Sequence, residues 1–357
     1  MYPRLAIDLK KLEHNARELC RRAGERGVTD IAFVTKVFTA DRRMVEAVAK
    51  SGCRYLADSR TQNLTTYGDL GKERILLRVA MPSEAEAVVA HAEISFQSEQ
   101  KTLRALEAAA ERAGKRHKVV LMIDLGDLRE GIFFRDTQQI METVDLVEAS
   151  PHLVLYGAAF NVTCYGSVLP TEENLGVFMG IVEQIEARIG GQLALISGGN
   201  SSSIKLMEDG GLPARVNNLR LGEALILGRE TAYEQDLEGM YQDAVILEAE
   251  VVEVQTKPSH PVGELGVNAF GEKMTYEDIG NRRRAICAIG RQDMDCDNLT
   301  PREAGVTVVG ASSDHLILDV TDCPQPVAVG DVLSFRMSYG ALLRGFTSKY
   351  VSRAYFD

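Results

Sequence analysis

The stretch Ile31-Ala32-Phe33-Val34-Thr35-Lys36 is a short apolar run that ends on a lysine. Such a run is typical of a β-strand buried on both faces, as in parallel sheets that are covered by helices. The C-terminal ends of these strands form the ligand side of an α/β sheet or barrel. Lys36 is then either a solvated chain end or a desolvated amine of depressed pKa that is suited to form a Schiff base. The stretch alone leaves both interpretations open.

The same rhythm of short apolar runs and helical periodicity continues along the chain to about residue 220. The predicted helices lie at 9–24, 41–50, 83–91, 100–114, 137–148 and 171–189. The predicted strands lie at 31–35, 55–59, 74–78, 93–96, 119–124, 153–160, 194–197 and 216–220. This alternation indicates a parallel α/β architecture, and the number of strands favours a (β/α)8 TIM barrel without excluding an open sheet.

The texture changes near residue 240. Five apolar, β-rich runs are separated by Pro/Gly turns, at 244–254, 285–289, 306–309, 316–320 and 332–335, and no helix is predicted among them. We therefore predict two domains, an α/β barrel at 10–230 and an all-β domain at 231–357 that includes residues 1–9.

Composition excludes several classes of function. The chain has 357 residues, of which 45% are hydrophobic and 25% charged, with a net charge of -11. The acidic balance argues against a nucleic-acid partner. No apolar run is long enough to span a membrane, and the N-terminus lacks a signal peptide's apolar core. Six scattered cysteines without a CxxC pair indicate reduced thiols and no metal site. We expect a cytoplasmic protein.

Polar clusters follow the predicted barrel strands, where barrel enzymes keep their active sites. Ser197-Gly198-Gly199-Asn200-Ser201-Ser202-Ser203 offers backbone amides and hydroxyls to an anion such as a phosphate, but is equally a flexible turn. Arg220-Leu221-Gly222-Glu223 supplies a cation and a close-approaching backbone amide. Arg129, within the carboxylate-rich turn 124–131, is either a partner of a substrate carboxylate or part of a structural salt bridge.

The β-rich half contains one dense polar turn, Ser312-Ser313-Asp314-His315, between two predicted strands. Asp314 and His315 are either an ordinary exposed turn or an acid/base or cation-binding pair.

Taken in this order, the motifs resemble those of the alanine/ornithine racemase family of fold-type III pyridoxal-phosphate (PLP) enzymes. The resemblance runs through nearly the whole chain. It implies a PLP-binding (β/α)8 barrel followed by a C-terminal β domain. It also implies a small amino-acid substrate and a head-to-tail homodimer whose active sites use residues of both chains.

The resemblance also implies roles for individual residues. Lys36 would hold PLP as a Schiff base and act as one of two proton-transfer bases, and Arg220 would face the pyridine nitrogen. The residues implied at the phosphate and around the cofactor ring are Ser201, the amides of Gly222 and Glu223, Tyr339, Asn161, Asn200 and Arg129. Asn161 stands where alanine racemases have a histidine, and Arg129 also lies near the substrate carboxylate.

The chain departs from alanine racemases at the second base. Their tyrosine is replaced by Arg291 in Gly290-Arg291-Gln292-Asp293, and arginine is a poor base. A second cofactor-side tyrosine is replaced by Ala40. His315 is therefore the candidate second base, with Cys164 as the next candidate.

In ornithine decarboxylases, a cysteine-aspartate pair from the partner chain meets the substrate, and Ser313-Asp314 resembles that pair. Asp314 would then bind a distal ammonium group, with Ser313, Arg291 and Cys164 also on the substrate side.

The sequence thus predicts a PLP-dependent racemase of a free basic amino acid, ornithine before lysine, that works by two-base proton transfer. An alanine racemase and a basic amino-acid decarboxylase of the same fold are the alternatives among enzymes. Arg220 argues against the decarboxylase, which uses a carboxylate at that position. A PLP-homeostasis binding protein is the non-enzymatic alternative, and the β-rich half argues against it.

Overall fold

The computed structural model describes residues 1–357, which form two compact units. The barrel unit comprises Leu9–Gln242, and the β unit comprises Met1–Asp8 and Asp243–Asp357. The barrel unit extends beyond residue 230 because the segment that follows is bonded back to its first helix. The Asn15 side chain exchanges two hydrogen bonds of 2.8 Å with the backbone of Tyr241.

The barrel unit is built on parallel strands in the order β10-β2-β3-β4-β5-β6-β8-β9, with the short β7 added beside β6. A parallel bridge between Ser197 and Asn218 joins the two ends of this series, so the sheet closes into a barrel. The fold class predicted from the sequence is confirmed. The strands are β2 (Ala32–Val34), β3 (Tyr55–Asp58), β4 (Glu73–Leu76), β5 (Ile94–Gln97), β6 (His117–Asp124), β7 (Ile132–Phe133), β8 (Leu153–Phe160), β9 (Leu195–Ser197) and β10 (Arg220–Leu221).

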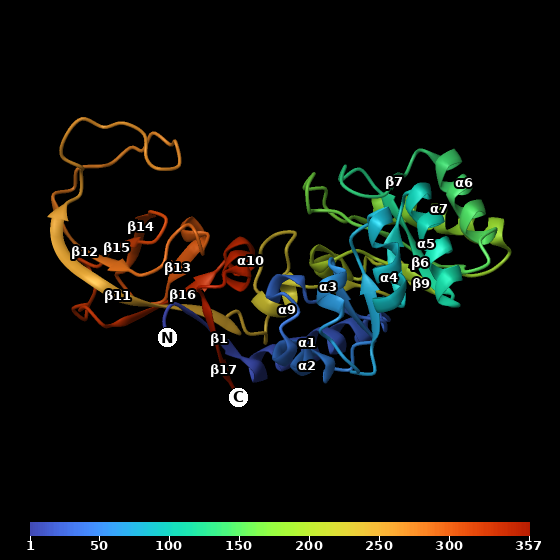
Figure 1. Cartoon of the computed structure of the whole chain (residues 1–357), viewed down its shortest axis with the longest axis horizontal. Coiled ribbons are helices and arrows are strands. Elements are labelled where there is room, and N and C mark those ends of the chain that lie inside the picture. The colour runs from blue at the N-terminus through green and yellow to red at the C-terminus, as the bar shows by residue number, and fades with distance from the viewer. The chain divides into compact units, whose positions relative to one another are not determined.

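The helices of the barrel unit lie outside this sheet (Figure 1). They are α1 (Leu9–Glu25), α2 (Arg42–Ala49), α3 (Thr61–Leu64), α4 (Ala85–His91), α5 (Gln100–Ala113), α6 (Thr137–Glu148), α7 (Glu172–Ile189), α8 (Ile204–Glu208) and α9 (Glu223–Leu227). Short 3-10 turns are η1 (Lys36–Phe38), η2 (Pro82–Glu84) and η3 (Ser201–Ser203).

Local sequence sets where several of these helices begin. The Asp41 side chain accepts hydrogen bonds from the first backbone amides of α2. Thr171 and Asn174 form a reciprocal capping box at the start of α7, with bonds of 2.9 and 3.2 Å.

Alternate residues of the strands fill the barrel interior, because successive side chains of a strand point to opposite faces. The largest interior side chains are Tyr55 and Phe96, both almost fully buried. The whole interior cluster is Ala32, Val34, Tyr55, Ala57, Ile75, Ile94, Phe96, Val120, Met122, Ala159 and Leu195. Phe33 faces the other side of β2 and is also fully buried, so the stretch that opens the fold is apolar on both faces.

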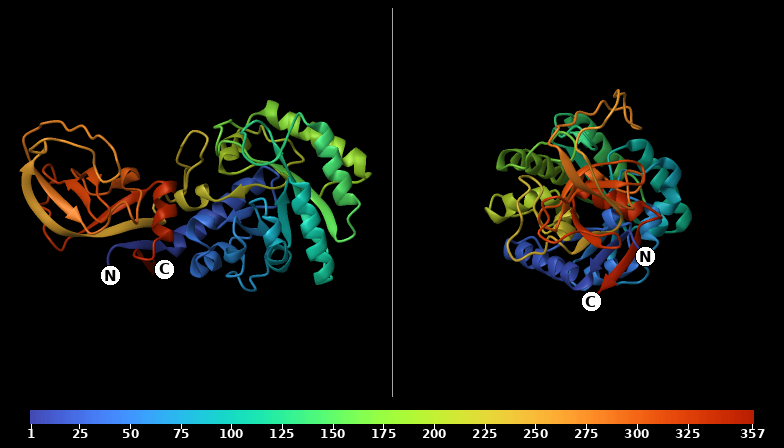
Figure 2. Two further views of the ribbon diagram at one scale, coloured as in Figure 1. Left: turned by 45° about the horizontal axis from the view of Figure 1, so that its top comes forward. Right: turned by 90° about the vertical axis from the view of Figure 1, so that its left-hand side faces the viewer.

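The β unit is a largely antiparallel sheet in the order β13-β16-β11-β12-β15-β14. Figure 2 shows its strands in orange and red. The N-terminal strand β1 pairs antiparallel with β11 and parallel with β17, which explains why residues 1–8 belong to this unit. The strands are β1 (Arg4–Asp8), β11 (Val245–Pro258), β12 (Asn281–Cys287), β13 (Leu299–Pro301), β14 (Thr307–Ala311), β15 (Leu316–Asp319), β16 (Val332–Met337) and β17 (Ser352–Phe356). A further 3-10 turn is η4 (Cys296–Asn298).

No α-helix lies among the five predicted β-rich runs at 244–335, but the description of residues 231–357 as all-β needs one correction. Helix α10 spans Tyr339–Thr347, and the Ser338 side chain caps it by accepting from the Ala341 amide at 3.3 Å. Two glycines weaken the intrinsic helical propensity of this segment. Burial of Leu342 and Phe346 against the β unit outweighs that preference.

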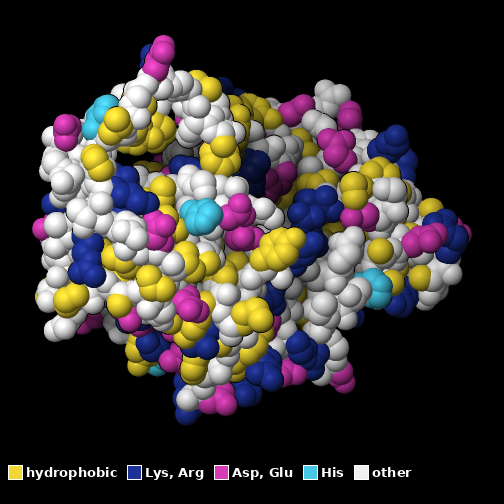
Figure 3. All heavy atoms as spheres, turned by 60° about the vertical axis from the view of Figure 1, so that its left-hand side comes forward, with side chains coloured by type: hydrophobic (Ala, Val, Ile, Leu, Met, Phe, Trp, Pro, Cys, Tyr) yellow, Lys and Arg dark blue, Asp and Glu magenta, His cyan; other side chains and the backbone are white.

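The surface mixes both signs of charge. On the face shown in Figure 3, basic and acidic side chains are interspersed. None of the helices is both long enough and apolar enough to cross a bilayer.

Candidate active site

Lys36 lies directly beyond the C-terminal end of β2, as the first residue of η1. Its side chain is exposed, whereas its neighbours Thr35 and Val37 are buried. The lysine side chain is therefore solvent-accessible and not desolvated, and it projects from the C-terminal end of a barrel strand. That end of a barrel is where ligands bind.

A buried polar network lies beneath Lys36. The Thr35 hydroxyl is 2.7 Å from the Asp58 carboxylate and 2.6 Å from the Tyr67 hydroxyl. Burial raises the pKa of the Asp58 carboxyl and of the Tyr67 hydroxyl above their usual values. Asn63 and the backbone amide of Arg60 each donate to Asp58 at 3.0 Å. The network fixes the backbone from which Lys36 projects.

Arg220 is the buried cation of the barrel. It lies on β10, which pairs with β2 at Ala32, so Arg220 and Lys36 come from neighbouring strands. Its guanidinium donates to the Ser197 hydroxyl at 2.6 Å and to the Phe160 carbonyl at 2.7 Å. Burial lowers the pKa of Arg220 to about 10, so it is cationic at neutral pH. No carboxylate contacts it directly, and its remaining N–H donors are available to a ligand.

Asn161 and Asn200 surround this cation. The Asn161 side-chain oxygen accepts from Arg220 at 3.2 Å and from Asn200 at 3.0 Å. The Asn161 amide nitrogen is buried and has no hydrogen-bond partner. Asn200 also donates to the Cys164 thiol at 3.4 Å. Four predicted site residues are thereby joined into one hydrogen-bonded group, Asn161, Cys164, Asn200 and Arg220.

A second cluster lies beside this group, where η3 meets the start of α9. The buried Ser201 hydroxyl accepts from the Ala224 backbone amide at 3.2 Å. A side chain at Gly222 would place a Cβ 3.1 Å from that of Val34, so the glycine allows β10 to approach β2 closely. The hydroxyls of Ser202 and Ser203 are buried and have no partner. The cluster thus offers hydroxyl and amide donors together.

Glu223 connects this cluster electrostatically to Lys36. Burial raises the pKa of its carboxyl to about 6, against the opposing charges of Arg229 and Lys36. A carboxyl that is partly protonated near neutrality repels an anion less than an ordinary glutamate does.

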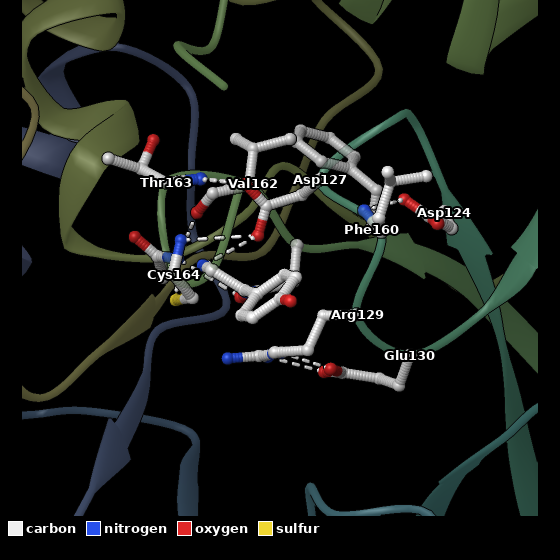
Figure 4. A network of polar contacts seen from close by, with 12 residues as sticks. Asp124, Asp127, Arg129, Glu130, Phe160, Val162, Thr163 and Cys164 are labelled. Carbon is white, nitrogen blue, oxygen red and sulfur yellow. Dashed lines mark hydrogen bonds and ion pairs between the residues drawn. The ribbon is translucent and has the colours of Figure 1, made fainter. Parts of the chain in front are cut away.

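Arg129 forms an ion pair with the adjacent Glu130. This is the structural salt bridge that was one of the two alternatives for Arg129 in the turn 124–131. Burial would lower the pKa of its guanidinium, but the pair with Glu130 outweighs burial and raises it. Cys164 and Asp127 add to this effect, so Arg129 lies within electrostatic range of the Asn161 loop. Figure 4 shows Arg129, Glu130 and Cys164 together with the loop that follows β8.

The remaining predicted residues belong to the β unit. Ser313, Asp314 and His315 are exposed in the hairpin loop between β14 and β15. The Ser313 hydroxyl donates to Asp314 at 2.7 Å, and the His315 Nδ1 lies 3.5 Å from the Ser312 hydroxyl. The loop therefore displays a carboxylate and an imidazole side by side.

Arg291 and Tyr339 also lie in the β unit. Arg291 forms a bidentate pair with Asp297, at 2.7 and 2.9 Å, and its Nε donates to the Ala311 carbonyl beside the hairpin loop. Tyr339 is the first residue of α10 and is partly exposed. These contacts fix where each residue lies within its own unit.

The sequence comparisons agree with this geometry. The family model described as "Alanine racemase, N-terminal domain" matches residues 7–230. The chain belongs to the alanine racemase family. It is 45% identical over 356 residues to an ornithine racemase of Acetoanaerobium sticklandii, with 99% of each chain covered. It is 38% identical over 357 residues to a lysine racemase of Thermotoga maritima, again with 99% of each covered.

Structural comparison gives the same fold for the family. An alanine racemase from Bartonella henselae with covalently bound pyridoxal phosphate superposes with a TM-score of 0.73. The two share 17% sequence identity over 99% of each chain. The resemblance stated from the motifs is confirmed.

Two parts of this site were missed in the sequence. Tyr67 lies outside every motif, and only the fold brings it to Thr35. Asp127 was quoted only as part of an acidic turn, yet it is fully buried. The role of Asp127 could have been predicted from the loop at 161–168. The backbone N–H groups of this loop need hydrogen-bond acceptors that no helix or strand supplies.

Proposed function

We propose that this chain is a PLP-dependent racemase that interconverts the L- and D-forms of a free basic amino acid, ornithine before lysine. That it is a racemase of its family follows from its full-length likeness to two racemases. The observation that carries the rest is the pairing of β2 with β10, which sets Lys36 and the buried Arg220 on neighbouring strand ends.

The residues present fit PLP. Ser201, the amides of Gly222 and Glu223, and Tyr339 would hold its phosphate, and the Ser201 hydroxyl already lies at the start of α9. Asn161 would lie beside the ring, and its buried, unpartnered amide nitrogen is a donor in need of an acceptor. Asn200 and Arg129 would complete that side, and Arg220 has N–H donors left for the pyridine nitrogen.

When bound, PLP is an electron sink that stabilises the negative charge left on the substrate Cα. Arg220 is a cation held by neutral groups. It would donate to the pyridine nitrogen and would keep that nitrogen unprotonated. This limits delocalisation of charge into the ring, which suits simple proton exchange. Decarboxylases of this fold have a carboxylate in the place of Arg220. The arginine therefore argues against decarboxylation.

Racemisation needs acid/base groups on opposite faces of the substrate. The Lys36 Nζ would hold PLP and move the α-proton on one face. The His315 imidazole is our candidate for the other face, since Arg291 is a poor base and is already paired with Asp297. Cys164 is the second candidate, because its thiol lies against Asn200.

We assign the preference for a basic substrate to Asp314. Its exposed carboxylate adjoins His315 and would bind the distal ammonium of ornithine or lysine, with Ser313 oriented toward it. Arg129 would meet the substrate carboxylate. Alanine has no group for Asp314 to bind.

We further propose a cytoplasmic head-to-tail homodimer in which the partner subunit's Asp314 and the partner subunit's His315 complete each barrel site. The likeness of Ser313-Asp314 to the partner-chain pair of ornithine decarboxylases supports this arrangement.

The function is tested by incubating the purified enzyme and PLP with L-ornithine, L-lysine or L-alanine and following optical rotation. We expect loss of rotation with ornithine and lysine, and a visible absorption band of bound PLP that Lys36→Ala abolishes. The matched control Lys205→Ala changes an exposed lysine of α8 that pairs with Asp209, and it should retain both. An unchanged band in Lys36→Ala would refute the role of this lysine.

The role of Asp314 is tested by Asp314→Ala. We expect KM for L-ornithine to rise roughly 10- to 100-fold, because a charged hydrogen-bond partner contributes about 1.5–3 kcal/mol, while residual turnover of alanine is spared. Asp322→Ala, at an exposed carboxylate of the same unit, is the control. Equal losses on ornithine and alanine would contradict a cation-binding role.

The shared site is tested by dissociating and mixing Lys36→Ala chains, which should be inactive, with Asp314→Ala chains, at L-ornithine concentrations so low that the Asp314→Ala dimer alone turns over little. If each site takes residues from both chains, random pairing restores about a quarter of the wild-type activity, because half of the dimers are mixed and each has one intact site. No recovery from a reassociated mixture would show that both residues act within one chain.

A further inference from the structure

Asp127 is a buried carboxylate that the proposed chemistry does not use. It follows β6, is fully buried, and faces the loop between β8 and α7 (Figure 4). One oxygen accepts from the backbone amides of Thr163 and Val168, at 3.0 and 3.2 Å. The other accepts from those of Cys164 and Tyr165, at 3.2 and 3.0 Å. A single side chain thus satisfies four backbone donors of one loop.

This loop cannot hold its shape by local preference. Thr163 and Ser167 have positive φ angles of 67° and 56°, which non-glycine residues adopt at a cost. A Cβ at Gly166 would lie 2.6 Å from the Asp127 carbonyl oxygen, so only glycine permits this approach. The loop tip, Cys164–Ser167, is exposed and has no strand or helix to pair with. One local bond, from the Thr163 hydroxyl to the Val168 carbonyl at 2.7 Å, supports the loop, and the carboxylate accepts from four of its backbone amides.

The loop ends at the polar group of the candidate active site. Asn200 donates to the Asn161 side chain and to the Val162 carbonyl, both at 3.0 Å, and to the Cys164 thiol. Asn161 in turn accepts from Arg220. A continuous series of contacts thus leads from the carboxylate, through the loop backbone, to the buried cation.

Asp127 is itself held firmly. The Asp124 carboxylate, at the end of β6, accepts from the amides of Gly126 and Leu128 at 2.9 and 3.1 Å. These two bonds fix the turn from which Asp127 projects. The carboxylate is therefore attached to the barrel strand and not to a mobile surface turn.

We propose that Asp127 is a positioning residue of the racemase site. It binds the backbone of residues 163–168 and so holds the Asn161 amide and the Cys164 thiol against Asn200 and Arg220. It contacts no substrate itself, because its carboxylate is buried and bonded to four amides. The proposal rests on the proposed function only where enzyme activity is the readout.

The first test needs no variant. Hydrogen exchange of the PLP-loaded enzyme should show slow exchange for the amides of Thr163, Cys164, Tyr165 and Val168, although the loop tip is exposed, because each donates to a buried acceptor. Exchange of these amides at the rate of an unstructured chain would overturn the proposal. The measurement is independent of any catalytic activity.

The second test uses Asp127→Asn. The NH2 group of the Asn would face two of the four loop amides, and a donor cannot accept their hydrogen bonds. The loop would lose these two bonds and become more mobile. We expect kcat/KM to fall roughly 10- to 100-fold, as for other residues that orient a site from outside it. The PLP absorption band should shift, and Cys164 should react faster with a thiol reagent. Cys164→Ser supplies the background from the other cysteines.

The control is Asp136→Asn at the start of α6, where the carboxylate accepts from a single backbone amide, that of Gln139 at 3.0 Å, and an Asn side-chain oxygen can still accept that bond. This variant should leave kcat/KM, the PLP absorption band and the reactivity of the Cys164 thiol unchanged. If Asp127→Asn behaves as this control does, the positioning role is refuted. If Asp127→Asn fails to fold, hydrogen exchange decides. Hydrogen exchange and thiol reactivity can be measured even if the protein has no racemase activity. Failure of the proposed function can therefore be told apart from failure of the positioning role.

Discussion

A guanidinium buried inside a barrel requires hydrogen-bond acceptors that cannot move, and Arg220 finds them at the ends of two other strands. Ser197 ends β9, the Phe160 carbonyl ends β8, and Arg220 itself starts β10. The parallel bridge between Ser197 and Asn218 closes the barrel at the same point. The same groups thus close the barrel and bind this cation. Lys36 follows the neighbouring strand β2.

The absence of a carboxylate on Arg220 has a chemical consequence. A directly paired cation would be neutralised and its donors occupied, whereas hydroxyl, carbonyl and amide partners leave the charge in place. Phe96 adds its ring face, with the guanidinium carbon 5.3 Å from the ring centre. The Asp127 carboxylate does not pair with Arg220. It accepts hydrogen bonds from the backbone amides of an adjacent loop.

Much of the fold was readable from the sequence, since strands buried on both faces and amphipathic helices carry strong local signals. The stretch at 31–36 is an example, because Ala32, Phe33 and Val34 are all buried as its apolar run predicts. Helix α10 was missed because its glycines conceal a helix that tertiary packing stabilises.

The candidate site residues of the barrel were predicted from motifs at strand ends, because parallel strands bring those ends together whatever lies between them. Asp58, Tyr67 and Asp127 were not assigned roles. Asp58 and Asp127 accept from backbone amides that a loop leaves unsatisfied, and Tyr67 meets the Thr35 hydroxyl. These contacts follow from three-dimensional closure and not from spacing. The roles of His315 and Asp314 remain predictions from the family resemblance.

The central claim is that two different groups exchange the α-proton on opposite faces, with Lys36 on one of them. The most direct measurement follows deuterium at Cα by NMR while His315→Gln acts on each enantiomer of ornithine in D2O. The account predicts that one enantiomer exchanges its α-proton with retained configuration and that racemisation is lost. Racemisation by His315→Gln at the wild-type rate would contradict it.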